Sequence, residues 1–289
     1  MEPRAGVATN SRAKTARLAF VVPAYNEEAL IGRCLESILR ETEDRTDDVD
    51  IVVVDNASTD RTGAIARSYP RVRVIEEPDK GLVKARHAGY RATDAPLIAN
   101  VDSDCSLTPG WVDTVFDAFD ADDDLAALSG PFIYDDLGRF GRGLTRVWYA
   151  IGYAIYRIDT RVFGLGGMLQ GGNFVVRRSA MEQIGGFDTS IEFYGEDSDV
   201  AYRISKVGRV KWTFKLPAYS SARRLKGEGF IATGFRYTVN HFAIHFGRGP
   251  VTKTHRDLRP HAPPGEPDSL ETSGDRPRSN QVSADYGSK

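Results

Sequence analysis

The sequence predicts an α/β fold in which helices flank a mostly parallel central sheet. From residue 18 onward, short runs rich in β-branched residues alternate with segments of helical periodicity. Such alternation implies right-handed crossovers and a parallel sheet that is covered on both faces. The first run, LAFVV at residues 18–22, is continuously apolar, as strands buried on both faces are. A chain of 289 residues is long enough for one large domain or two small ones.

Each element follows from its own local pattern. Residues 26–40 are predicted to form a helix, with Asn26 as the N-cap and with Glu27 and Glu28 in the first turn. This helix carries one apolar stripe, made of Leu30, Ile31, Cys34, Leu35, Ile38 and Leu39. Further strands are predicted at residues 50–56, 71–77, 96–102 and 125–130, and further helices at residues 58–69, 82–92 and 111–119.

The composition is that of an ordinary globular protein. A net charge of −2 gives no general attraction to nucleic acid, which we therefore exclude as a partner. Two cysteines, Cys34 and Cys105, cannot build a disulfide framework and lack zinc-site spacing, so we expect a reducing, cytoplasmic setting. No apolar run reaches the ~18 residues that a spanning helix needs. Residues 1–16 and 251–289 are poor in large apolar side chains and are expected to be a flexible tail and a disordered tail.

One of several Asp-x-Asp pairs is placed to bind a ligand. In parallel sheets ligands bind beyond the carboxyl ends of the strands, and Asp102 and Asp104 directly follow a predicted strand. The other pairs of the N-terminal half precede a strand, at residues 48–50 and 120–124. Two polar clusters, PAYNEE and DNASTD, fall at the same edge as Asp102. There Asp55 is expected to accept an N–H from a nucleobase, while Tyr25 either flanks the base or ribose or packs at the sheet edge.

Six motifs in this order resemble the inverting family 2 glycosyltransferases, which have a GT-A fold. They are VVPAYNEE (21–28), VVDNASTDRT (53–62), KGLVKARHAGYRA (80–92), NVDSDCSLTPGW (100–111), QGGNFVVRRSA (170–180) and FYGEDSDVAYRISKVGRV (193–210). The resemblance implies a GT-A domain over residues 17–225. Its nucleotide-sugar-binding half is expected at residues 17–130 and its acceptor and catalytic half at residues 131–225. A basic loop and an amphipathic helix are expected to follow at residues 226–250.

The resemblance implies a metal-dependent transferase whose donor is a nucleotide-diphosphate sugar. It assigns Asp104 to a divalent metal, Mn or Mg, and places Asp102 on the ribose or in the metal shell. A hard cation held by carboxylates can neutralise the charge that grows on the leaving diphosphate. Basic side chains near the phosphates would add to that stabilisation. The full set of expected donor-binding residues is Pro23, Tyr25, Glu27, Asp55, Lys84, Arg86, Asp102, Arg223 and Arg224.

The acceptor and the catalytic base are expected in the second half. Gly171, Gly172 and Asn173 stand just before a short strand, where glycines allow the backbone to approach a sugar closely. By resemblance Asp197 is the catalytic base, and Glu196 is a supporting or acceptor-binding carboxylate. An inverting transfer needs one carboxylate to take the acceptor hydroxyl's proton.

The favoured function is transfer of a hexose-like sugar to a carbohydrate or lipid-linked acceptor, such as a precursor of a cell-envelope polysaccharide. Two alternatives stay open: a nucleotidyltransferase, and a non-catalytic module that binds sugar nucleotides. Two amphipathic stretches, at residues 143–163 and 229–249, have aromatic and Arg-rich borders. They indicate either peripheral contact with the inner face of a membrane, or packing onto the core or onto a partner subunit.

Overall fold

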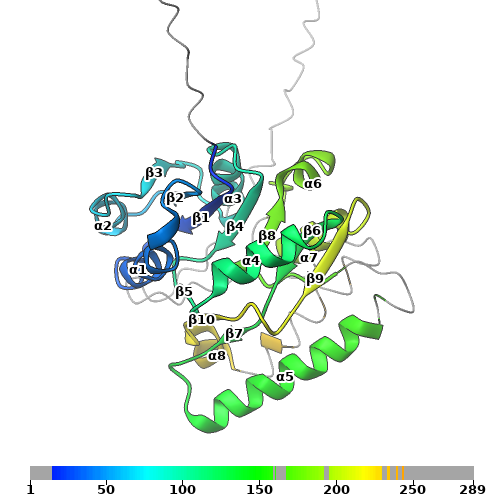
Figure 1. Cartoon of the computed structure of the whole chain (residues 1–289). Helices are drawn as coiled ribbons and strands as arrows, with labels where there is room; N and C mark the ends of the chain where they lie inside the picture. Colours follow the sequence, from blue (N-terminus) through cyan, green and yellow to red (C-terminus); the bar gives the residue numbers. More distant parts are fainter. Residues whose placement is uncertain are drawn as a thin grey trace, which may run out of the picture.

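The computed structural model describes residues 15–158, 160, 167–191, 195–229, 233–234, 239 and 243. Its centre is a seven-stranded sheet in the order β3-β2-β1-β4-β8-β6-β9 (Figure 1). The strands of this sheet are β1 (Leu18–Ala24), β2 (Val49–Asp55), β3 (Arg73–Glu76), β4 (Leu97–Val101), β6 (Leu125–Ser129), β8 (Asn173–Arg177) and β9 (Arg209–Trp212). Only β8 runs antiparallel to its neighbours in this sheet, so the predicted α/β fold with a mostly parallel sheet is confirmed.

Helices cover both faces of the sheet. They are α1 (Ile31–Glu41), α2 (Thr62–Arg67), α3 (Leu82–Arg91), α4 (Trp111–Asp120), α5 (Arg139–Ile158), α6 (Arg178–Gln183), α7 (Glu196–Ile204) and α8 (Arg223–Glu228), with a 3₁₀ turn η1 at Glu43–Arg45. Alternate side chains of each central strand enter two separate cores. Phe20 and Val22 of β1 join the core under α1, α2 and α4, whereas Val21 joins the core under α3, α6 and α7. Burial on both faces is why these strands are continuously apolar.

A second, three-stranded sheet lies beside the carboxyl ends of the main strands. It has the order β5-β10-β7, from β5 (Cys105–Leu107), β10 (Ala218–Ser220) and β7 (Phe132–Ile133). These three strands are too short to show a periodicity, and the sequence did not predict them. Strands β8 and β9 of the main sheet come from the expected acceptor half, so the two expected halves share one sheet.

Two local predictions are wrong. Asn26 does not cap α1, which begins at Ile31; it has a positive φ of 49°, and its side chain accepts a 2.8 Å bond from the N–H of Thr59. The start of the basic loop predicted from residue 226 onward belongs to the short helix α8, which ends at Glu228. Most of the amphipathic stretch expected at residues 229–249 lies outside the described residues, as do the two tails apart from residues 15–16.

Close packing of α3 on the sheet generates a stability prediction. A Cβ added at Gly89 would lie 2.2 Å from Cγ1 of Val21 in β1, so Gly89→Ala should lower the free energy of unfolding by roughly 1–3 kcal/mol. Gly152 in α5 is the matched control, since nothing lies within 4 Å of its added Cβ. Gly152→Ala should raise the free energy of unfolding by roughly 0.5–1 kcal/mol. Urea unfolding of both variants measures the contrast, and an equal effect of both would contradict the packing.

Candidate functional site

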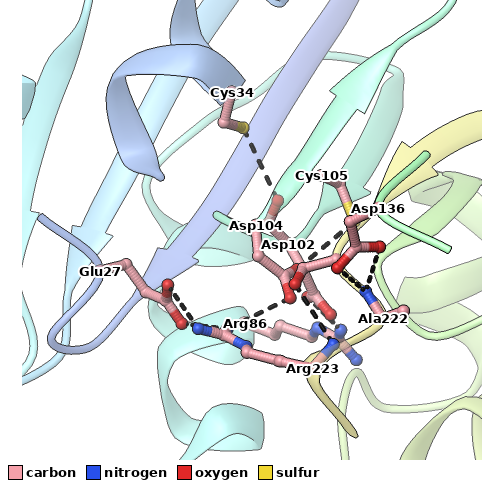
Figure 2. A network of polar contacts seen from close by, with 10 residues as sticks. Glu27, Cys34, Arg86, Asp102, Asp104, Cys105, Asp136, Ala222 and Arg223 are labelled. Carbon is pink, nitrogen blue, oxygen red and sulfur yellow. Dashed lines mark hydrogen bonds and ion pairs between the residues drawn. The ribbon is translucent and has the colours of Figure 1, made fainter. Parts of the chain in front are cut away.

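Three carboxylates converge at the carboxyl edge of the main sheet. Asp102 and Asp104 follow β4, and Glu27 follows β1. The guanidinium of Arg223, from α8, joins two of these carboxylates (Figure 2). Its Nη1 donates to Glu27 Oε2 at 3.0 Å, its Nη2 also contacts Glu27, and its Nη2 donates to Asp104 Oδ2 at 3.1 Å. The predicted donor-binding and metal-binding residues of β1, β4 and α8 are therefore brought together.

The cluster is rich in negative charge. Burial raises the pKa of Asp104 to about 6; Arg223 opposes this rise, and the neighbouring carboxylates of Asp102 and Glu27 add to it. Carboxylate oxygens are the ligands that hard divalent cations prefer, so the donor set of Asp104 and Asp102 fits Mg or Mn. Within the described part of the chain no group of three or more His, Cys, Asp or Glu is arranged to hold a metal ion.

Arg86 is placed differently from the prediction. Its side chain is fully buried, so it does not present its guanidinium to a donor from solvent. It donates from Nη2 to Asp102 Oδ1 at 2.7 Å and from Nη1 to the Glu196 carboxylate, while its Nε has no hydrogen-bond partner among the described residues. Arg86 therefore ties α3 to the residue after β4 and to the first residue of α7. Lys84, two residues earlier, is outside this bridge, and its ammonium lies 3.7 Å from Asp79.

The head of α7 carries the predicted catalytic pair. Gly195, with a φ of +91°, turns the chain into the helix, and Glu196 and Asp197 are its first two residues. Asp197 accepts from the N–H of Ser198 at 2.7 Å and, through Oδ2, from the N–H of Gly171 at 3.1 Å. Burial raises the pKa of both carboxyls, that of Glu196 to about 7, although the positive charge of Arg86 opposes the rise. Carboxyls with raised pKa in a buried site are suited to proton transfer.

The two glycines before β8 lie against the carboxylates of the site. Gly172 has a φ of +81°, and a Cβ there would lie 2.3 Å from Asp102 Oδ2, so this position requires glycine. A Cβ at Gly171 would lie 3.3 Å from oxygens of both Glu196 and Asp197, which is a tight contact. The loop formed by Gly171 and Gly172, called the glycine loop here, thus adjoins the carboxylates after β4 and at the head of α7.

Asn173 has a different environment from these glycines. Its side chain is fully buried; Oδ1 accepts from Trp111 Nε1 at 3.0 Å, and Nδ2 donates to the carbonyls of Gly130 and Leu216 at 3.1 and 2.9 Å. These bonds use the amide internally, so the predicted contact between its side chain and an acceptor is not supported by its position. Asn173 instead fixes the glycine loop against α4 and two further segments.

The remaining predicted residues lie along the same sheet edge. Pro23 is buried within β1, and the half-buried ring of Tyr25 lies 4.3 Å from Lys80 Nζ. Asp55, the last residue of β2, accepts a 3.2 Å bond from the N–H of Ser58. Arg224 is half-buried on α8, next to Arg223.

Sequence reasoning missed two residues that position the site. Asp136, after β7, accepts from the N–H of Ala222 at 2.9 and 3.1 Å and from Lys226 Nζ at 2.9 Å, and so holds α8 beside the carboxylates (Figure 2). Cys34 of α1 directs its thiol toward the carbonyl of Asp102, at 3.6 Å. Neither residue belongs to a motif. The one available signal for Asp136 was its place in an acidic pair, Asp135 and Asp136, after a short apolar run.

Comparison with known proteins agrees with the motifs. Residues 19–185, more than half of the chain, match the family model described as glycosyl transferase family 2. The chain is 37% identical over 91 residues to the glycosyltransferase EpsJ of Bacillus subtilis, a match that covers 30% of this chain and 26% of EpsJ. It is 35% identical over 119 residues to validoxylamine A glucosyltransferase of Streptomyces hygroscopicus subsp. limoneus, covering 39% of this chain and 24% of that protein. These matches span about a quarter of each relative's length.

Two solved structures share the fold. The mannosyltransferase PcManGT of Pyrobaculum calidifontis, in complex with GDP-Man and Mn²⁺, superposes with a TM-score of 0.62 at 22% identity, over 81% of this chain and 64% of that one. TarS of S. aureus, residues 1–349, gives a TM-score of 0.57 at 15% identity, over 82% of this chain and 67% of that one. At these identities the likeness establishes the fold, which is the predicted GT-A fold.

Titration of Glu196 generates a prediction about pH. Its ordinary pKa is 4.5 and its folded value is about 7, so between these values the folded chain keeps a proton that the unfolded chain has released. The free energy of unfolding should therefore fall as pH rises from about 4.5 to 7. Glu196→Gln should flatten this fall by roughly 1–3 kcal/mol. Urea unfolding at several pH values measures it, with Glu182→Gln on the exposed side of α6 as the control. An unchanged slope in Glu196→Gln would contradict the assignment.

Proposed function

The chain belongs to glycosyl transferase family 2, and on that basis we propose that it transfers a sugar, with inversion, from a nucleotide-diphosphate sugar to an acceptor hydroxyl. One observation supports this most directly: the Asp197 carboxylate is held by two backbone N–H groups at the head of α7, beside the glycine loop. Through Glu196, Arg86 and Asp102, the same site adjoins the carboxylates at the end of β4. The carboxylate that we propose as the base and the anionic cluster that we propose for the metal are therefore connected by side-chain bonds.

In the proposed step the acceptor oxygen bonds to the anomeric carbon while Asp197 takes the hydroxyl proton. The bond from that carbon to the diphosphate oxygen breaks, and its electron pair stays on the diphosphate. Because attack comes from the face opposite the leaving group, an α-linked donor gives a β-linked product. Glu196 supports the base: its buried carboxyl, bonded to Arg86, keeps the head of α7 in place and adjoins Gly171. Gly171 and Gly172 give the acceptor close access to the backbone.

We assign the donor to the carboxyl edge of β1, β2 and β4. Asp104, with Asp102, would hold Mg or Mn, which when bound supplies positive charge to the departing diphosphate. Arg223 and Arg224 on α8 add cationic charge beside it, and paired arginines match phosphate geometry. Glu27 orients Arg223 through its bonds to the guanidinium. Asp55, Pro23 and Tyr25 are placed to meet the nucleoside, with Asp55 as an acceptor for an N–H of the base.

The relatives support a class of sugar and a class of acceptor for the proposed reaction. A glucosyltransferase and a mannosyltransferase bound to GDP-Man support a hexosyl donor. A chondroitin synthase of Escherichia coli, 34% identical over 115 residues that make up 38% of this chain and 16% of that protein, supports a polysaccharide or its lipid-linked precursor as acceptor. We place the reaction in the cytoplasm, at the inner face of the membrane. No observation favours the nucleotidyltransferase or the non-catalytic module over this function.

The proposed base gives a kinetic prediction. Asp197→Asn should lower turnover by about 10²–10⁴-fold, the usual contribution of a positioned general base, with little change in donor affinity. Asp199→Asn is the matched control on the same helix, because Asp199 pairs with Arg203 one turn on and faces neither glycine. Turnover is measured after a screen of UDP-, GDP- and dTDP-sugars with Mn or Mg. Normal turnover in Asp197→Asn, or a product of retained configuration, would reject the mechanism.

The proposed metal ligand gives a second prediction. Asp104→Asn should abolish most turnover and weaken the stimulation by Mn or Mg, because the leaving diphosphate loses its counter-charge. Asp120→Asn tests specificity, since Asp120 belongs to another Asp-x-Asp pair and forms an exposed ion pair with Arg17. Circular dichroism should show both variants folded. Full activity of the unmodified chain in the presence of a chelator would exclude the metal role.

A further inference from the structure

Helix α5 has an apolar face that points away from the protein. Seven of the nine exposed large apolar side chains among the described residues lie on it, from 40% exposed at Ile155 to 86% at Phe140. They are Phe140, Leu144, Val147, Trp148, Ile151, Ile155 and Ile158, and of these Trp148, at the border of the stripe, also lies against Gly234. Their spacing of three or four residues puts them in one stripe along the whole helix. Figure 1 shows α5 as a long helix at the outer edge of the molecule. An exposed apolar stripe of this length indicates a binding surface.

The opposite face fixes how α5 is turned. Tyr149 stacks on Trp212 with 6.0 Å between ring centroids, and Tyr153 lies 5.6 Å from the same ring. The hydroxyl of Tyr156 donates to the carbonyl of Val210 at 3.1 Å. These tyrosines lie on the other side of the helix from the stripe, so α5 cannot rotate to bury the stripe without losing them.

The charge of α5 indicates which kind of surface the apolar stripe would bind. The helix contains Arg139, Arg142, Arg146 and Arg157 and no Asp or Glu, although the whole chain has a net charge of −2. A helix with one apolar face, aromatic residues and only positive charge is typical of helices that lie in the surface of an anionic bilayer. A second copy docked through this face would add another helix with arginines and no acidic side chain, so the two helices would offer each other no opposite charge. Within the described part of the chain no helix is both long and apolar enough to span a bilayer.

We propose that α5 docks on an anionic lipid surface and that the site takes an acceptor anchored in that surface. The inference about the acceptor rests on the proposed function, whereas the inference about lipid docking does not. Val147 and Ile151, both more than half exposed, would enter the acyl boundary, while the arginines would remain among the headgroups.

Two bonded paths connect the docked helix with the site. On its inward face Tyr149 donates to Gln170 Oε1 at 3.1 Å, and the next residue, Gly171, donates to Asp197. Before its first residue, Asp136 holds α8, which carries Arg223 to Asp104. Docking would therefore set both the glycine loop and α8 at a defined height above the lipid. A hydroxyl on a lipid-linked acceptor would reach Asp197 from the membrane side.

The test measures partition of the full chain onto vesicles with phosphatidylglycerol and onto vesicles of phosphatidylcholine alone. We expect stronger binding to the anionic vesicles, weakened by added salt. Val147→Glu should lower the partition by at least about tenfold, because it places a charge in the apolar face. Val207→Glu is the matched control, an exposed valine beyond the end of α7, and should change the partition by less than about twofold. Arg146→Glu should also weaken binding, whereas Lys215→Glu on another exposed loop should not.

Several results would overturn the proposal. Equal partition onto both kinds of vesicle, or none onto either, would reject the lipid surface. A different result would also reject it: the chain does not bind vesicles, light scattering shows that it is a dimer, and Val147→Glu dissociates that dimer. Donor hydrolysis without vesicles is measured in parallel, so that the two proposals fail separately. If the chain hydrolyses a donor but does not bind vesicles, the docking is rejected and the proposed function stands. If it binds vesicles but turns over no donor, the proposed function is rejected and the docking stands.

Discussion

The whole site depends on one buried guanidinium. Arg86 is fully buried and bonds Asp102 and Glu196, which are 94 residues apart along the chain. Without this cation the buried carboxylate of Glu196 and the half-buried carboxylate of Asp102 would lose their shared partner. Breaking a buried ion pair commonly costs about 3–5 kcal/mol. Through Arg86, helix α3 joins the edge of β4, where we place the donor, to the head of α7, where we place the base. One side chain, that of Arg86, thus helps to set the distance between the proposed donor site and the proposed base.

A second arginine has the opposite character. Arg223 also joins two carboxylates, Glu27 and Asp104, but its side chain is 26% exposed and it comes from a six-residue helix near the end of the described chain. Arg86 is thus enclosed by the fold, whereas Arg223 lies on the solvent side of the carboxylates. Together they oppose the rise that burial and mutual repulsion cause in the pKa of Asp104 and Glu196. The acidic cluster is therefore neutralised from within by a buried arginine and from the solvent side by a partly exposed one.

The sequence was informative wherever a local pattern carried the answer. Continuous apolar runs predicted the buried strands, and the rule about carboxyl ends separated Asp102 and Asp104 from other Asp-x-Asp pairs. The errors have a common physical origin in contacts between distant segments. Nothing near Arg86 indicates that its partners are Asp102 and Glu196, and nothing near Asn173 indicates that Trp111 and two carbonyls use its amide. Strands β5, β7 and β10 have two or three residues each, and only their pairing with one another defines them.

The two cysteines have a practical consequence. Cys34 and Cys105 are fully buried, and burial together with the nearby carboxylates raises the pKa of both thiols, so neither forms the reactive thiolate in the native chain. They are the only cysteines in the sequence. A cysteine introduced at an exposed position can therefore be labelled selectively with a maleimide dye or a spin label while the native thiols stay in place. The molecule is suited to distance spectroscopy without the cysteine replacements that would disturb the backbone of Asp102.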